Sequence, residues 1–423
     1  MTTRRKFLIG SAAIAGGVVI GYRLDLPERL ASLANLEFTP TELTPYVIID
    51  KKGITIITPR AEMGQGIHTT LAALVAEELD VSMKSVRVEH GPASDKYANT
   101  LMYGSPPYPP ELQDVPKQST GGQTSVRDAF VKMRQAGAAA RIMLMEAAAA
   151  RLGVEIETLS TSQGAVVDAA GSRIPYVDLA AAAARFEPLV EPPLKSRRQW
   201  TLLGKSLPRV DMVGKCTGTA GYGIDVTQPD LLYATVKRNP RLGGEMLGYD
   251  ATKASQMPGV EQIIPMDAGV IVVATNTWYA FQAADQIEFD WGPAPYPEST
   301  DEHRQRLELE LDQNFYIRPR KWGRVESALD GASVIAGQYR VPYLAQSALE
   351  PRNATALLKD GRLDIWAGSQ FPDLAQLVGA KLTGLEKGAV RVHTPYLGGG
   401  FGRRFEMDDV EDAVRAAQAL PGR

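Results

Sequence analysis

A run of three glycines near the C-terminus constrains this chain more than any other feature. The stretch reads Leu397-Gly398-Gly399-Gly400-Phe401-Gly402-Arg403-Arg404. Glycine adopts backbone angles that other residues avoid and allows another group to approach the chain closely. Phe401 lies inside this run, where no helix or strand face accounts for its ring. Two arginines follow, and their planar charged groups suit phosphate or carboxylate. A tight turn with a packed Phe401 is the simpler interpretation of these residues alone.

Other parts of the chain also place a glycine-bearing turn directly before a helix. Gly64-Gln65-Gly66 precedes an expected helix over residues 67–79, and residues 119–125 open another that runs to about Leu152, with Gly153 as its stop. Backbone N–H groups at a helix start attract anions, so both turns are candidate phosphate sites. Plain turns and helix capping explain the same residues, since Ser125 and Asp128 have capping-box spacing.

Composition and length limit the class of protein. A chain of 423 residues is long enough for two or three domains, and 44% hydrophobic with 22% charged residues is typical of a soluble globular protein. The formal net charge of −3 gives no support for nucleic-acid binding. With one cysteine, Cys216, the chain forms no internal disulfide, structural zinc site or iron–sulfur cluster. We expect Cys216 to be packed, and any onward electron carrier to lie on another chain.

Hydrophobic periodicity predicts an α+β chain. The expected hairpins pair residues 45–50 with 54–58, and 354–358 with 363–367 across Asp360-Gly361. Further strands are expected at 232–237, 270–274, 286–290, 333–342 and 389–393. Further helices are expected at 175–185, 277–284, 373–382 and 408–420. Residues 38–44, 99–117, 187–209 and 292–320 are expected to form loops, linkers or connectors.

The N-terminus is typical of an export signal. Arg4 and Arg5 precede a short apolar stretch from residue 8 to 20, as in twin-arginine signals. This stretch is too short for a transmembrane helix of about 20 residues. A basic tip on a buried helix is the alternative. No small-x-small cleavage site follows at the usual distance, so this segment is a candidate uncleaved membrane anchor, and we expect a periplasmic location.

Five motifs taken together resemble one family. They are Glu62-Met63-Gly64-Gln65-Gly66, Gly218-Thr219-Ala220-x-Tyr222-x-Ile224-Asp225, Leu349-Glu350-Pro351, Gly368-Ser369-Gln370 and the glycine loop. This set resembles the molybdopterin-binding large subunit of the molybdenum hydroxylases, the xanthine dehydrogenase and aldehyde oxidase family. In most members the Met-Gly-Gln-Gly segment follows the glycine loop. Here it comes first, as in the isoquinoline 1-oxidoreductase beta-subunit type.

The resemblance implies a molybdenum–molybdopterin cytosine dinucleotide, whose metal is held by the pterin dithiolene and not by protein side chains. Gln370 and Phe401 match residues beside the metal. The matching cofactor-binding residues are Gly64, Gln65, Gly66, Ser119, Thr120, Gly121, Gly122, Gln123, Thr124, Ser125, Gly399, Gly400, Phe401, Gly402 and Arg403. Glu350 is close to the family pattern, and a structural carboxylate that pairs with an Arg or an amide explains it equally well.

The resemblance also implies a domain organisation. The expected parts are a signal or anchor (1–24), a linker (25–44), the dinucleotide side of the molybdopterin-binding domain (45–190), a second linker (191–208), a small α/β hammerhead-like domain (209–300), and the first, incomplete part of the molybdopterin-binding domain (301–423).

The implied reaction is hydroxylation of an N-heteroaromatic or an aldehyde with water as the oxygen source. The implied partners are a [2Fe-2S] small subunit, a c-type cytochrome acceptor, and a chain that carries the missing C-terminal half. The family's general base is a glutamate beyond Arg423, so this chain alone is expected to be inactive. Two alternatives stay open: a non-catalytic or split-enzyme fragment that binds the cofactor, and an exported binding module without cofactor.

The export signal generates a direct prediction. Changing Arg4→Lys together with Arg5→Lys keeps the charge but removes the arginine pair, so the protein should stay in the cytoplasm. Cell fractionation of the tagged variant and wild type checks this. Equal export of both proteins would refute the assignment.

Overall fold

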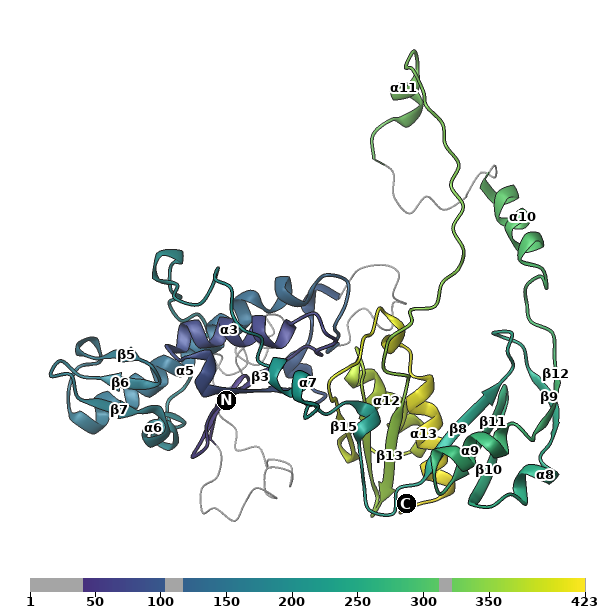
Figure 1. The fold of residues 1–423 in the computed structure, drawn as a ribbon. Helices are drawn as coiled ribbons and strands as arrows, with labels where there is room; N and C mark the ends of the chain where they lie inside the picture. Colours follow the sequence, from purple (N-terminus) through teal and green to yellow (C-terminus); the bar gives the residue numbers. More distant parts are fainter. Residues whose placement is uncertain (1–40, 103–116, 312–321, 423) are drawn as a thin grey trace. The chain divides into compact units, whose positions relative to one another are not determined.

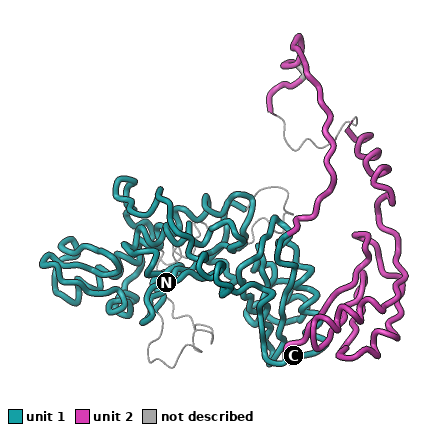
Figure 2. Tube along the Cα trace, in the orientation of Figure 1, with its two compact units in different colours: residues 1–230, 348–423 teal, residues 231–347 magenta. Residues whose placement is uncertain are grey.

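The computed structural model describes residues 41–102, 117–311 and 322–422. The predicted export signal, most of the linker before residue 45 and most of the loop at 99–117 lie outside the described residues. The described chain mixes helices with small sheets, which confirms the predicted α+β class (Figure 1). It divides into two compact units, one formed by residues 1–230 and 348–423 and the other by residues 231–347 (Figure 2).

A four-stranded sheet begins the first unit. Its strands are β1 (Thr41–Thr44), β2 (Val47–Asp50), β3 (Gly53–Thr58) and β4 (Val86–His90), in that spatial order. The predicted hairpin is confirmed as β2 and β3. Residues 41–44 were expected to be linker, which is wrong, because they pair with β2 and bury Leu43 and Thr44. So short a strand shows no periodicity.

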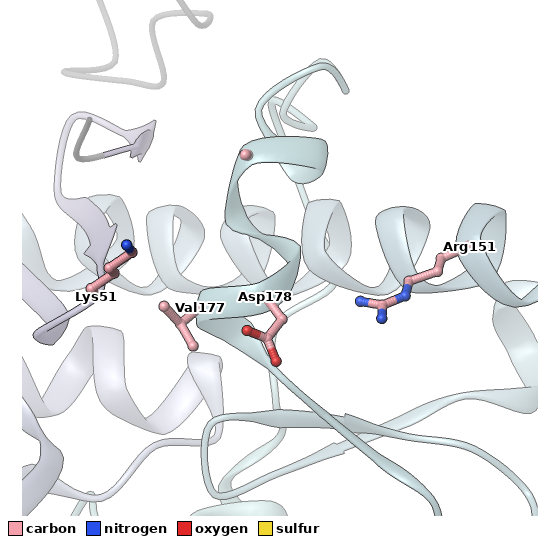
Figure 3. Close-up of a pocket in the computed structure, with 5 residues that line it drawn as sticks. Lys51, Arg151, Val177 and Asp178 are labelled. Carbon is pink, nitrogen blue, oxygen red and sulfur yellow. The ribbon is translucent and has the colours of Figure 1, made fainter. Parts of the chain in front are cut away.

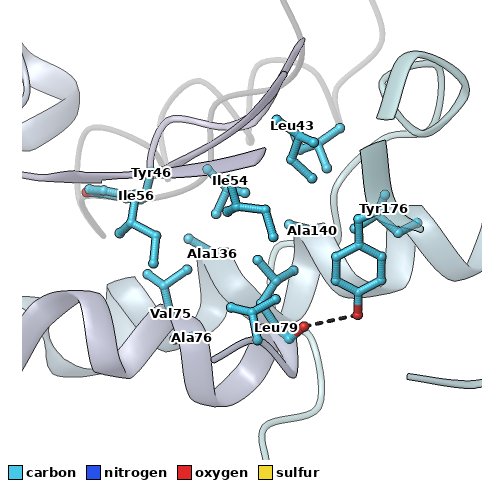
Figure 4. Close-up of a cluster of buried hydrophobic side chains, with 14 of the residues drawn as sticks. Leu43, Tyr46, Ile54, Ile56, Val75, Ala76, Leu79, Ala136, Ala140 and Tyr176 are labelled. Carbon is cyan, nitrogen blue, oxygen red and sulfur yellow. Dashed lines mark hydrogen bonds between the residues drawn. The ribbon is translucent and has the colours of Figure 1, made fainter. Parts of the chain in front are cut away.

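Two long helices cover this sheet. Helix α3 (Ile67–Leu79) joins the parallel strands β3 and β4, and α5 (Ser125–Leu152) ends at Gly153 in a left-handed conformation, both as predicted. In the main core, Val75 of α3 and Ala140 of α5 are buried together with Ile56 of β3 (Figure 4). In the same core the Tyr176 hydroxyl donates to the Leu79 carbonyl at 3.0 Å. Tyr176 begins α6 (Tyr176–Ala183), next to β5 (Ser160–Ser162), β6 (Ala165–Val167) and β7 (Arg173–Pro175).

The stretch at 187–209 has little regular structure but lies against α3. The buried Glu77 carboxylate accepts hydrogen bonds from the backbone N–H groups of Thr201, Leu202 and Leu203. Glu78 accepts from the Lys195 amide and pairs with Arg134 of α5. These buried carboxylates satisfy backbone donors that no strand or helix supplies with a partner. The segment expected as a linker is therefore fixed to the helix layer.

The second part of this unit is a three-stranded sheet with two helices. Strands β13 (Ala354–Lys359) and β14 (Arg362–Ala367) form the predicted hairpin, with positive φ at Asp360 and Gly361. Helix α12 (Pro372–Thr383) leads to β15 (Val390–His393), which is parallel to β14. Helix α13 (Asp408–Ala419) buries Val410, Val414 and Ala417, the stripe that its periodicity predicts.

Residues 231–347 form the other unit. Its strands are β8 (Tyr233–Arg238), β9 (Met246–Asp250), β10 (Val260–Met266), β11 (Gly269–Ala274) and β12 (Glu288–Trp291), and its helices are α8 (Thr252–Ser255), α9 (Thr277–Ala284), α10 (Thr300–Leu311) and α11 (Val325–Leu329). β8, β10 and β11 form one sheet, and β9 pairs with β12. The predicted strand at 333–342 is wrong. These apolar residues have strand propensity but no strand beside them in the described chain, and Ile335 is 97% exposed.

One further expectation concerns the exposure of Cys216. Cys216 lies in the short helix α7 (Met212–Thr217) and is exposed, so the expectation that it is packed is wrong. Among the described helices, none combines the length and apolarity that a membrane crossing requires.

The contact between α3 and α5 depends on Gly137. A Cβ at this position would lie 2.6 Å from the Val75 carbonyl oxygen of α3. Gly137→Ala should therefore lower the free energy of unfolding by about 1–3 kcal/mol, as overpacking does. Urea denaturation measures the change. Gly214→Ala in α7 is the matched control, since its Cβ would meet nothing closer than 3.5 Å. Equal stability of both variants would contradict this account of the contact.

Candidate functional site

Gln370 joins segments that are far apart in the sequence. Its backbone N–H donates to the Arg404 carbonyl and its carbonyl accepts from the Thr120 amide, each at 2.9 Å. Its side-chain Nε2 donates to the Thr120 carbonyl at 2.8 Å, and Oε1 accepts from the Gly402 amide at 3.1 Å. The side chain is 2% exposed. The turn at 119–125 and the glycine loop, which were both singled out from sequence, thus meet at one glutamine.

The third predicted segment, which contains Met63, packs closely against the glycine loop near Gln370. A Cβ on Gly400 would lie 2.6 Å from the Met63 sulfur and 2.8 Å from Gln370 Oε1. A Cβ on Gly121 would lie 2.7 Å from the Phe405 ring. Contacts this short do not occur between real side chains, so both positions require glycine. Met63, Gly121, Gln370 and Gly400 therefore belong to one region of the first unit.

The Glu62 carboxylate binds backbone N–H groups of its own turn, residues 62–66, and of the helix start that follows. Glu62 is buried and accepts from the amides of Gly64, Gly66 and His68, at 2.9 to 3.1 Å. The Gln65 side chain also turns back, accepting from the Met63 amide and donating to the Ala61 carbonyl. The start of α3 is thus capped from within. Binding of a cofactor by Gly64, Gln65 or Gly66 stays a prediction, and these groups already have protein partners.

A charge cluster that sequence reasoning missed supports Glu62. Arg209 donates to Glu62 at 3.1 Å and pairs with Asp211, which also pairs with Lys215. Burial opposes ionisation of Asp211, but hydrogen bonds from Arg209 and Lys215 hold the pKa of its carboxyl well below the usual range. The sequence signal was present in the four-residue spacing of Asp211, directly before α7, and Lys215 within it. Because a new domain was expected to begin at residue 209, a contact between Asp211 or Lys215 and the turn at 62–66 was not predicted.

The turn at 119–125 leaves polar groups free. Ser119 is 1% exposed, and its Oγ has no hydrogen-bond partner within the described part of the chain. Helix α5 begins at Ser125 without a side-chain cap, because the Thr124 hydroxyl donates to the Gly121 carbonyl instead. An uncapped start of a 28-residue helix beside a buried free hydroxyl fits an anionic group such as phosphate.

The predicted capping box at Ser125 and Asp128 is wrong. Asp128 forms a fully buried ion pair with Arg60, and its other oxygen accepts from Lys132 and from the Thr100 amide. Because both oxygens of Asp128 already accept from Arg60 and Lys132, neither is placed to cap the backbone N–H groups at the helix start. Because Arg60 is far away in the sequence, the spacing alone gave no sign of this competing partner.

Phe401 has a strained backbone and an exposed ring. Its φ is 52°, a left-handed value that a large residue rarely adopts, and 71% of it is exposed. Gly399 and Gly402 beside it also have positive φ. Packing does not explain this strain, since the ring joins none of the buried clusters. Strain of this kind accumulates at functional sites, where the surrounding structure holds it.

Two hollows are lined by none of the predicted cofactor-binding residues. One of about 870 Å³ is lined by Trp366, Gln376, His90 and His393 among others. Burial lowers the pKa of His90 to about 3, so its ring is neutral. The other, of about 390 Å³, lies beside Lys51, Arg151, Val177 and Asp178 (Figure 3). In the described ranges, no cluster of three or more His, Cys, Asp or Glu side chains suits a metal ion.

Glycine turns that converge on a buried glutamine, beside a free helix start, are features of a protein that binds an anionic cofactor. Two family models named "Molybdopterin cofactor-binding domain" match the chain, one over residues 308–422 and the other over residues 16–106. The chain carries these domains and is homologous to the large subunits of the molybdenum hydroxylases, as its motifs predicted.

Three curated relatives illustrate the similarity. The beta subunit of isoquinoline 1-oxidoreductase from Brevundimonas diminuta is 29% identical over 99% of this chain and 58% of its own length. A membrane-bound aldehyde dehydrogenase [pyrroloquinoline-quinone] of Gluconacetobacter polyoxogenes is 31% identical over 100% of this chain and 54% of its own. A nicotinate dehydrogenase subunit of Pseudomonas putida is 27% identical over 90% of this chain and 32% of its own. The chain thus spans about half of the first two relatives and a third of the last.

Solved structures with partial similarity include quinoline 2-oxidoreductase from Pseudomonas putida 86, at 19% identity and a TM-score of 0.41 over 51% of this chain and 33% of that one. Another is the aldehyde oxidoreductase from Desulfovibrio desulfuricans, at 23% identity and a TM-score of 0.42 over 59% of this chain and 33% of that one.

Asp373, which binds the residue before Ser119, makes the stability of the protein depend on pH. Its Oδ2 accepts from the Gln118 amide at 2.9 Å, and burial raises the pKa of its carboxyl to about 6. Because the folded state holds this proton more tightly than the unfolded state, the contribution of Asp373 to stability falls as pH rises from about 4 to about 6, by up to about 3 kcal/mol. Asp373→Asn should remove this part of the pH dependence.

Denaturation of wild type and Asp373→Asn at several pH values measures the difference between them. Asp178→Asn, in the first turn of α6, is the control because Asp178 is exposed. A difference between wild type and Asp373→Asn that stays constant from pH 4 to pH 6 would contradict this assignment.

Proposed function

We propose that residues 119–125 and the glycine loop bind a molybdenum–molybdopterin cofactor in a subunit of an oxidoreductase that acts on an aldehyde or an N-heteroaromatic compound. The observation that supports this most is the convergence of these segments on Gln370, next to the unpartnered Ser119 hydroxyl. When bound, the cofactor would supply two-electron oxidation at carbon with water as the oxygen source. The names of the relatives, which include an isoquinoline and a nicotinate enzyme, support this substrate class.

The residues have separate roles in this proposal. Ser119 Oγ and the free N–H groups at the start of α5 hold the phosphate of the dinucleotide, which we take to be the cytosine form. Gln370 uses one Nε2 hydrogen for the Thr120 carbonyl, and its second hydrogen is left for an oxygen of the cofactor. The exposed Phe401 ring would be available to contact the bound cofactor.

The remaining proposals concern the assembly. Electrons leave through a [2Fe-2S] partner subunit to a carrier such as a c-type cytochrome, because a single cysteine does not hold a cluster. The whole enzyme works in the periplasm after twin-arginine export. Coexpression of this chain with candidate small subunits, followed by affinity purification, tests the partnership.

Ser119→Ala tests the cofactor site. The hydroxyl has no protein partner, so its loss should change the free energy of unfolding little but lower the bound molybdenum and pterin by about tenfold, because a hydrogen bond to a charged group contributes about 1.5–3 kcal/mol. Metal analysis and pterin fluorescence after purification give both contents. Thr44→Val is the matched control, since it removes another buried hydroxyl without a partner, in β1.

The outcomes separate the alternatives. Equal cofactor content in Ser119→Ala and wild type would contradict the assignment of this turn. A folded wild type with neither molybdenum nor pterin would favour a cofactor-free binding module.

A further inference from the structure

Glu350 is an acceptor for several elements of the site at once. It is 8% exposed, and its Oε1 accepts from the Ile224 amide at 3.1 Å and from Asn353 Nδ2 at 3.0 Å. Its Oε2 accepts from the Gly398 amide and from Arg404 Nη2, both at 2.8 Å. All four partners donate hydrogen bonds, and this arrangement suits a carboxylate, whose two oxygens accept.

Arg404 completes the arrangement from the other side of the loop. It is 1% exposed, and its Nε donates to the Gly399 carbonyl at 2.8 Å while Nη1 donates to the Gly368 carbonyl at 3.3 Å. The Glu350 amide binds the Gly398 carbonyl at 3.1 Å. The Glu350 main chain therefore holds the Gly398 carbonyl, and the Arg404 side chain holds the Gly399 carbonyl. A Cβ on Gly398 would lie 2.3 Å from the Glu350 Cβ, so the loop is glycine here to fit the pair.

With these carbonyls held, the following amides are left free. In the part of the chain that the structure describes, the backbone N–H groups of Gly399, Gly400 and Phe401 have no hydrogen-bond partner. The next amide, that of Gly402, binds Gln370 Oε1. Successive free amides in a turn with positive φ form a concave donor group for an anion or a polarised oxygen.

We infer that the buried Glu350–Arg404 pair is a positioning element, which fixes the glycine loop so that the amides of Gly399, Gly400 and Phe401 face the cofactor beside Gln370. This inference rests on the proposed function for the identity of the ligand, and on the contacts alone for the control of loop shape. Neither residue touches the reacting atoms. Each acts through the backbone of the loop.

Amide hydrogen exchange measures loop shape without reference to activity. In Glu350→Gln, a side-chain N–H₂ replaces one acceptor and meets donors, so the exchange of the Gly402 and Arg403 amides should speed up about tenfold or more. Neither amide bonds to Glu350 itself, and they bind Gln370 Oε1 and the Gly400 carbonyl. Amides of β14 and β15 should exchange as in wild type. The bound molybdenum and pterin should fall about tenfold in the same variant.

Two further variants keep the test decisive. Arg404→Lys retains the charge in case Glu350→Gln does not fold, and should also loosen the loop because an ammonium does not bridge the carbonyls of Gly399 and Gly368 together. Glu78→Gln is the matched control, as it breaks the buried Glu78–Arg134 pair away from the loop. If Glu350→Gln speeds exchange equally in the loop and in β14 and β15, as Glu78→Gln would through global stability, the positioning role is wrong.

The result also separates the two proposals. Wild type without cofactor, but with loop-specific exchange in Glu350→Gln, would overturn the proposed function and leave the control of loop shape intact. Wild type with cofactor, but without loop-specific exchange in either variant, would overturn the positioning role alone.

Discussion

The four hydrogen bonds of Gln370 are the interaction on which the rest of the site depends. Its main chain lies between Thr120 and Arg404, and its side chain spans from Thr120 to Gly402. A buried amide with both ends engaged fixes the two segments relative to each other, and an unsatisfied donor or acceptor there would cost about 1–3 kcal/mol. These bonds join the segment that carries the free hydroxyl of Ser119 to the glycine loop with its free amides.

Buried carboxylates hold other irregular segments in the same way, by hydrogen bonds to their backbone N–H groups. Glu62 caps α3, Glu77 holds the stretch after residue 200, and Glu350 holds the glycine loop. Each accepts several backbone N–H groups that no regular element satisfies, and Glu62 and Glu350 also pair with an arginine. Charges buried in this way are tolerated because every oxygen has donors around it. The irregular segments that these three carboxylates bind are therefore held by buried hydrogen bonds.

Sequence periodicity predicted the elements that local forces define. The two hairpins, the helices at 67–79 and 125–152 and the buried stripe of α13 follow from alternation, turn residues and helical spacing. What depends on distant partners was not predictable. Residues 41–44 become a strand because β2 lies beside them, and residues 333–342 form no strand because none of the described strands lies beside them. Asp128 is drawn away from the helix start because Arg60 binds it. The segments of the site, with Glu62 among them, were found through a family resemblance. The alternative that Glu350 is a structural carboxylate pairing with an Arg or an amide is confirmed by Arg404 and the Gly398 amide. The contact of Arg209 with Glu62 emerges only from the packed structure.

The position of the metal is the most direct test of the central claim. Anomalous diffraction at the molybdenum absorption edge, from crystals of the cofactor-loaded protein, locates that atom without assumptions about the pterin. The account predicts a single molybdenum peak beside Gln370 and Phe401. A peak in the hollow lined by His90 and Trp366, or at any place without contact to the glycine loop, would contradict it.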